Sequence, residues 1–172
     1  MASAPPSTTP ATAGGVVTAA VSGLGGHPVL TPGGPALDFS VTVRNGTGQG
    51  LQDIQPLVSM GHCSCSQSGA AMMPTGTLQL RNPSTGVWQS IDYDTEGTGM
   101  DFSFVNQISG VALAAGASRT FDYRVALVKS STAGSQPTRD GSGTIDVTVQ
   151  QLPAHTAFAP AISTPVYVNT AA

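Results

Sequence analysis

Short segments in which apolar and polar residues alternate recur along most of the chain. In 37–44 the apolar residues occupy every second position, and Ile145, Val147 and Val149 repeat this spacing. Alternation of period two places apolar side chains on one face of a β-strand. Turn signals such as Asn45-Gly46 separate the segments, and no segment keeps a helical period beyond two turns. The pattern predicts an all-β fold, an antiparallel β-sandwich of roughly seven to nine strands.

Two neighbouring segments predict a β-hairpin. Residues 77–81 (Thr-Leu-Gln-Leu-Arg) and 87–91 (Val-Trp-Gln-Ser-Ile) alternate in the same way, and the loop between them, Asn-Pro-Ser-Thr-Gly, ends in glycine. Such a loop is typical of a hairpin. The aromatic residues Trp88, Phe121 and Tyr123 fall at strand positions, so we expect them to pack in the core or across strands rather than to form a ligand platform.

Residues 1–14 differ in composition from the rest of the chain. They consist mainly of Ala, Pro, Ser and Thr and carry no charged side chain. This composition predicts an extended N-terminal arm, with one sandwich domain over 15–172. An arm of this kind is able to reach a neighbouring molecule, while a terminal tail that contacts nothing is the ordinary alternative.

The sparse charge of the chain excludes several classes of protein. Only 9% of the residues are charged, which is too few for the exposed faces of a helical bundle. The six lysines and arginines are scattered singly and the formal net charge is -3, so we expect no nucleic-acid binding. No apolar run approaches the roughly 20 residues that span a bilayer, so we expect no membrane insertion.

Two features bear on localisation. The first ten residues have neither the basic region nor the apolar core of a secretory signal. A surface of Thr, Ser, Gln and Asn nevertheless suits a protein that works outside the cytoplasm. We therefore expect an extracellular location, reached after removal of a signal or by another route such as lysis.

The sequence Met60-Gly61-His62-Cys63-Ser64-Cys65 holds both cysteines of the chain. Met60, His62, Cys63 and Cys65 together offer thioether, imidazole and thiolate ligands, which suit Cu(I) or Zn(II). On an extended strand, however, His62 and Cys63 face opposite ways. A local disulfide between Cys63 and Cys65 and a pair of inert free thiols are the two other interpretations, and the sequence leaves all three open.

A second cluster of candidate ligands is acidic. Asp92, Asp94 and Glu96 occupy positions 1, 3 and 5 of a calcium-loop pattern, and a glycine follows at position 6. Position 12 is Ser103 instead of the bidentate glutamate. A looser calcium site that includes Asp101 is one interpretation, and a solvated acidic loop between strands is the other. The same acids do not flank a cleft, which weakens a glycosidase interpretation.

Two stretches resemble the bacterial extracellular immunoglobulin-like modules. They are Val41-Thr-Val-Arg-Asn45-Gly-Thr-Gly and Leu113-Ala-Ala-Gly116-Ala-Ser-Arg-Thr-Phe121-Asp-Tyr-Arg-Val125. The segments 62–65, 76–80 and 96–101 are similar more narrowly to uncharacterised secreted proteins of high-GC actinobacteria. The resemblance implies an immunoglobulin-like sandwich, and members of the group serve as surface, adhesion and spacer modules. Related domains also occur on phage capsids and tails.

These observations favour a non-enzymatic protein. We expect a structural module that decorates an extracellular assembly, such as a phage capsid or tail, and that attaches through its arm and sheet edges. Its partners would be proteins, in a homo-oligomer or a lattice. A secreted actinobacterial adhesion module that binds a wall component or a protein is the alternative. The third hypothesis is a small Cu/Zn-binding or redox protein. No Gly-x-Ser-x-Gly motif and no other catalytic constellation is present, and no cofactor beyond calcium, copper or zinc is suggested.

Overall fold

A computed structural model describes residues 15–65, 76–91, 108–129, 139–158 and 161–170. The predicted arm, 1–14, and the acidic cluster of Asp92, Asp94, Glu96 and Asp101 lie outside these described residues. No described residue belongs to a helix, so no described helix is long and apolar enough to cross a membrane.

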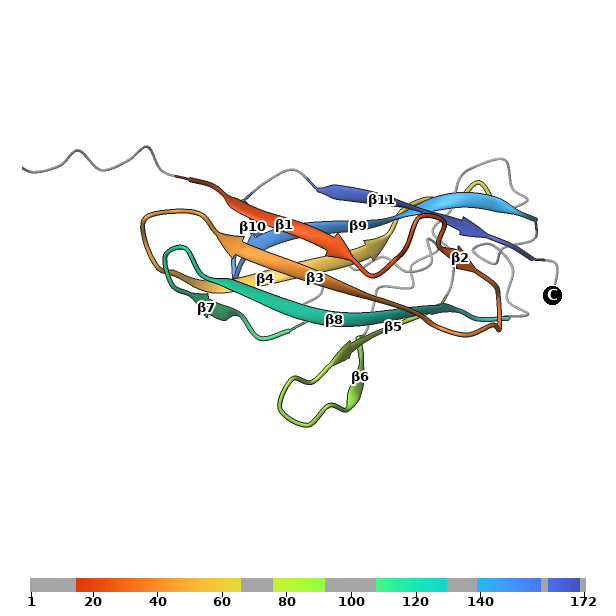
Figure 1. Cartoon of the computed structure of the whole chain (residues 1–172), viewed down its shortest axis with the longest axis horizontal. Helices are drawn as coiled ribbons and strands as arrows, with labels where there is room; N and C mark the ends of the chain where they lie inside the picture. Colours follow the sequence, from red (N-terminus) through yellow and green to blue (C-terminus); the bar gives the residue numbers. More distant parts are fainter. Residues whose placement is uncertain (1–14, 66–75, 92–107, 130–138, 159–160, 171–172) are drawn as a thin grey trace, which may run out of the picture.

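The described strands form two sheets that pack face to face (Figure 1). The first sheet has five strands, in the order β1 (Val17–Ser22), β3 (Leu37–Asn45), β8 (Ser118–Leu127), β5 (Gly76–Arg81) and β6 (Trp88–Ile91). The second has six, in the order β2 (Val29–Leu30), β11 (Ile162–Val168), β9 (Gly141–Gln151), β4 (Leu51–Met60) and β7 (Val111–Leu113), with β10 (Thr156–Ala157) beside β9.

The topology is that of an immunoglobulin-like β-sandwich. The orders β1-β3-β8-β5 and β11-β9-β4 correspond to the A-B-E-D and G-F-C sheets of that fold. The predicted fold class is therefore confirmed, with two corrections. The described residues form eleven strands instead of seven to nine, because β2, β7 and β10 have only two or three residues, too few to show alternation. The β2–β11 pair is also parallel, whereas the prediction was of an antiparallel sandwich.

The core lies between the sheets and is built from the alternating apolar residues. On β3, Phe39, Val41 and Val43 point inward, and each is at most 3% exposed. The inward residues of β8 and β9 follow the same spacing. Phe39 and Tyr123 stack across the β3–β8 pair, with ring centroids 5.6 Å apart. The period-two pattern thus identified the buried faces correctly, because each strand exposes its other face to solvent.

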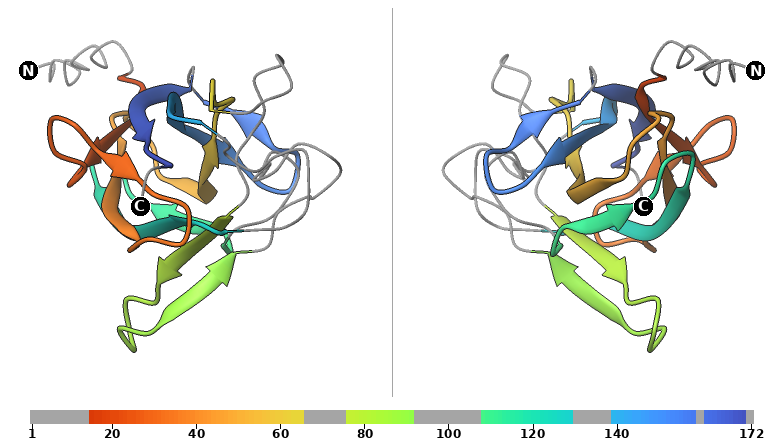
Figure 2. Two further views of the ribbon diagram at one scale, coloured as in Figure 1. Left: turned by 90° about the vertical axis from the view of Figure 1, so that its right-hand side faces the viewer. Right: turned by 90° about the vertical axis from the view of Figure 1, so that its left-hand side faces the viewer.

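The predicted hairpin is also present. β5 pairs with β6 from Leu78, opposite Ile91, to Arg81, opposite Trp88. Figure 2 shows this hairpin projecting away from the body of the sandwich. Trp88 lies on the outer face of its sheet and is only partly buried, so it packs across strands and not in the core.

Candidate functional site

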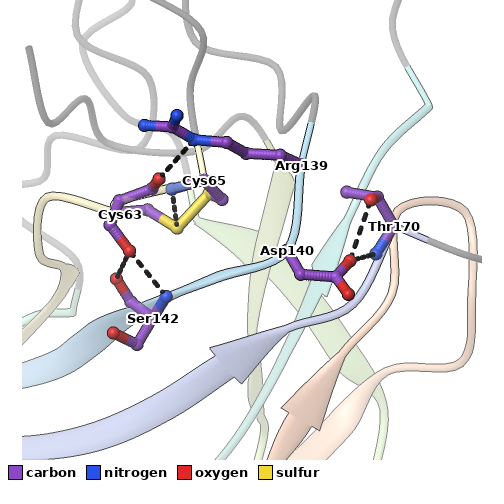
Figure 3. Close-up of a disulfide and its surroundings, with 7 residues drawn as sticks. Cys63, Cys65, Arg139, Asp140, Ser142 and Thr170 are labelled. Atoms are coloured by element: carbon purple, nitrogen blue, oxygen red, sulfur yellow. Dashed lines mark hydrogen bonds between the residues drawn. A yellow bond between two sulfur atoms is a disulfide. The ribbon is translucent and has the colours of Figure 1, made fainter. Parts of the chain in front are cut away.

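The cysteines lie in a short segment, 61–65, that follows β4 and that we call the disulfide loop. The sulfur atoms of Cys63 and Cys65 are bonded to each other at 2.04 Å, and both residues are buried. The chain continues along β9 after β4 ends. The Ser64 amide donates to the carbonyl of Ser142 at 2.9 Å, and the Ser142 amide donates to Ser64 Oγ at 3.0 Å (Figure 3).

Gly141 of β9 allows this close approach, whereas a side chain at Gly143 would make only an ordinary contact with the loop. A Cβ atom on Gly141 would lie 2.6 Å from the amide nitrogen of Cys65. A Cβ atom on Gly143 would lie 3.4 Å from the carbonyl oxygen of His62. Any larger residue at position 141 would push the loop off the strand. The Gly-Ser-Gly run at 141–143 is the sequence signal for this packing, and it has no meaning until β4 and β9 are known to be neighbours.

The four predicted soft-metal ligands do not converge. Met60, Cys63 and Cys65 are buried, whereas His62 is exposed in the loop that follows β4. In the disulfide state neither cysteine offers a thiolate. Among the described residues no group of three or more His, Cys, Asp and Glu side chains is arranged to hold a metal ion.

Two charged residues lie just before β9: Arg139 bonds the disulfide loop, and Asp140 bonds the segment that follows β11. Arg139 donates its amide to the Cys65 carbonyl at 3.2 Å and its Nε to the Ser64 carbonyl at 3.1 Å. The next residue, Asp140, accepts hydrogen bonds from the amide of Thr170 at 2.8 Å and from its hydroxyl at 2.9 Å (Figure 3). These bonds hold the pKa of the Asp140 carboxyl below its ordinary value. The disulfide loop therefore has a structural role, which we call the clasp: it holds the chain after β4 against the start of β9.

A second region, beside β8, contains a cleft. β5 pairs with β8 only as far as Leu80, which lies opposite Tyr123. Beyond this point β5 turns away with β6, and a cleft of about 660 Å³ opens between the hairpin, β8 and residues 108–111. We call it the hairpin cleft. No described strand pairs with the cleft side of β8 over 118–122.

The described lining of the hairpin cleft combines apolar and charged side chains. Its apolar members are Leu80, Ile108, Val111 and Phe121, and its charged members are Arg81, Arg119 and Asp122.

The charged groups give the cleft a local positive character. The Arg119 guanidinium lies 5.5 Å from the Phe121 ring centroid, and Arg81 Nε donates to the Gly86 carbonyl at 3.3 Å. Asp122 accepts a hydrogen bond from the Ser40 hydroxyl at 2.7 Å. Neither arginine pairs with a carboxylate within the described ranges. Two of the six basic residues of this acidic chain therefore line one cleft.

A smaller hollow of about 280 Å³ adjoins the hairpin cleft on the outer face of the first sheet, and the two share Arg81 and Asp122. Trp88 borders it, and the Arg124 guanidinium lies 4.5 Å from the Trp88 ring centroid. Arg124 is held in place by a hydrogen bond from its Nε to Gln79 Oε1. Sequence reasoning missed this region, although the hairpin register, which places Arg81 opposite Trp88, was a usable signal.

No protein-family model matches this chain. No curated protein matches it either. Solved structures share its fold at low identity. AvmM, which catalyses macrocyclization in alchivemycin A biosynthesis, is 15% identical with a TM-score of 0.56, and the match covers 91% of this chain and 90% of AvmM.

Two further matches are less similar. PapD-like domain 7 of human CEP192 is 11% identical, with a TM-score of 0.35 and coverage of 99% of this chain and 96% of that one. A family 123 glycoside hydrolase from Clostridium perfringens is 10% identical, with a TM-score of 0.42 and coverage of 91% of this chain and 27% of that one. At these identities the likeness to AvmM concerns the β-sandwich alone, because one fold hosts many unrelated functions.

Proposed function

We propose that this chain is a non-enzymatic extracellular adhesion module that binds a protein partner at a cell surface. The observation that carries the proposal is the hairpin cleft, a cationic hollow beside a length of β8 that has no strand partner on this side among the described residues. Its volume lies within the range of about 300–1,000 Å³ that is usual for ligand sites. Virion decoration, which the composition of residues 1–14 favoured, stays a prediction because that arm lies outside the described residues.

The groups around the cleft suit binding better than catalysis. Arginine, aromatic and apolar side chains are typical of recognition surfaces. None of the three histidines belongs to its described lining, and both cysteines are sequestered in a disulfide. The described lining thus supplies neither an imidazole nor a thiol, which supports binding over catalysis. The buried disulfide also supports an oxidising, extracellular setting.

The proposal is tested by sedimenting the purified chain with isolated cell envelopes of a high-GC actinobacterium. We expect binding that is lost after the envelopes are treated with protease. The double variant Arg81→Ala/Arg119→Ala should bind at least about ten-fold more weakly, since each arginine contributes charge-assisted hydrogen bonds. Arg44→Ala is the matched control, because Arg44 is exposed on β3 and is not part of the described lining of the cleft.

Three outcomes would contradict the proposal. The first is the absence of binding to envelopes. The second is binding that survives protease, which would indicate a wall polysaccharide as the ligand. The third is equal binding by the double variant and the parent chain, which would place the contact elsewhere on the molecule.

A further inference from the structure

We propose that the partner contributes an extended acidic peptide segment, which adds as a strand to the open edge of β8 inside the hairpin cleft. This inference rests on the proposed function and specifies the chemistry of the partner. The segment would lie beside residues 118–122, in the place that β5 leaves when it turns away after Leu80.

The main chain of β8 offers hydrogen-bonding groups to an added strand. On its other side β8 pairs with β3, for example Asp122 opposite Ser40 and Thr120 opposite Thr42. In an antiparallel sheet, roughly half of the amide and carbonyl groups of a strand point toward each neighbour. Those of 118–122 that point toward the cleft have no strand partner among the described residues. A peptide strand of five residues, about 16 Å long, satisfies them.

The charged side chains of the cleft suit an acidic segment. Successive side chains of an added strand point to opposite faces of the sheet. Arg81 lies on the outer face of the first sheet, whereas Arg119 has the inward parity of Phe121 on β8. An inward acidic residue of the segment therefore has Arg119 within its own layer. An outward acidic residue has Arg81, on the face where the Asp122 carboxylate accepts a hydrogen bond from Ser40. Carboxylate and guanidinium pair through two parallel hydrogen bonds, which also fixes the register of the strand.

The apolar lining of the cleft suits an apolar side chain of the partner. Leu80, Ile108, Val111 and Phe121 line the cleft, and of these Phe121 is buried. An apolar side chain of the partner that points inward, between the two sheets, would be removed from water there. The expected motif thus carries an apolar and an acidic residue at alternate inward positions, the acidic one for Arg119, and an acidic residue at an outward position for Arg81.

A sugar chain would satisfy the arginines but not the strand edge. Its hydroxyl groups do not repeat at the spacing of the amide and carbonyl groups along β8, whereas those of a peptide strand do. Recognition through the edge of a strand derives affinity from the main chain and selectivity from alternate side chains. The combination of an open edge with two guanidinium groups favours the acidic peptide.

The experiment selects binders of the full chain from a library of short random peptides. The best binder is then synthesised twice, once unmodified and once with every second amide N-methylated. We expect acidic residues to be enriched in the selected peptides, and the methylated copy to bind at least about ten-fold more weakly because its donors to β8 are lost. Hydrogen exchange of the β8 amides over 118–122 should slow when the unmodified peptide binds.

Variants and outcomes separate this inference from the proposed function. Arg81→Ala/Arg119→Ala should weaken peptide binding by at least about ten-fold, while Arg44→Ala should leave it unchanged. Equal binding of the methylated and unmodified peptides would overturn strand addition, even where envelope binding still depends on the arginines. Selection of peptides without acidic residues, or arginine-dependent binding of a uronic acid oligosaccharide in place of any peptide, would overturn it as well.

Discussion

The disulfide loop and the hairpin cleft both form where a strand runs past the end of its regular pairing, and their outcomes are opposite. After β4 ends at Met60, the chain stays on β9, and Gly141 lets it lie against the strand. After Leu80, β5 leaves β8 and opens a cleft. The sulfur atoms of Cys63 and Cys65 are therefore buried in the disulfide loop, while the guanidinium groups of Arg81 and Arg119 line an accessible cleft. Side chains are buried where the chain stays against the neighbouring strand, and they are accessible to a partner where it leaves that strand.

The largest expected effect comes from Gly141→Ala. The new Cβ atom would meet the Cys65 amide nitrogen at 2.6 Å and Ser64 Oγ at 2.8 Å, so the loop must shift. We expect a loss of about 3 kcal/mol in the free energy of unfolding, measured by urea denaturation. Gly48→Ala is the control, because its Cβ atom meets nothing within 4 Å, and its effect should stay within about 0.5 kcal/mol.

The same variant sharpens the comparison of the two regions. Envelope binding by folded Gly141→Ala should equal that of the parent chain, because the disulfide loop and the hairpin cleft share no described residue. A parallel loss of stability and binding would show that the two regions are coupled.

An intermediate effect is expected from Cys63→Ala/Cys65→Ala. The disulfide closes a loop of only three residues, so loop closure contributes roughly 1.5 kcal/mol, and the lost packing of the buried sulfur atoms raises the total to about 2 kcal/mol. Urea denaturation of the double variant and of the reduced parent chain measures this difference. If the double variant lost metal binding or partner affinity that the parent chain has, the role of the disulfide loop would not be purely structural.

The smallest effect is expected from Asp140→Ala, which tests the clasp through its pH dependence. The pKa of this carboxyl is lowered in the folded state by its hydrogen bonds to Thr170, so its contribution to stability is present above the unfolded pKa, about pH 4. That contribution is lost as the pH falls through the folded pKa. The parent chain should therefore be more stable than the variant at neutral pH, and the difference should shrink in acid. A difference that is independent of pH would contradict this role of Asp140.

Much of the fold could be predicted from local patterns. Alternation located the long strands and their buried faces, because a strand that covers a core must carry apolar residues at every second position. The hairpin at 77–91 was predictable for a similar reason, since its two strands and its loop are contiguous in the sequence. The short strands β2, β7 and β10 were missed because two or three residues contain no detectable period.

The candidate site was less predictable. The sequence drew attention to Cys63 and Cys65, because cysteine is a reactive residue type wherever it occurs. It left a disulfide, free thiols and a metal site as alternatives. It gave no comparable sign at Arg81 and Arg119, which are ordinary surface residues when each is seen in its own segment. Their proximity depends on the pairing of β5 with β8, strands separated by long intervening sequence, and on the residue at which that pairing stops.

The sequence by itself determined the class of fold, the inward residues and the low-charge surface, because these depend on composition and on a spacing of two residues. The tertiary structure alone decided that the disulfide loop packs against Gly141 of a distant strand and that a cationic cleft opens beside β8. Both depend on contacts between residues far apart in the chain, whose register no local pattern encodes.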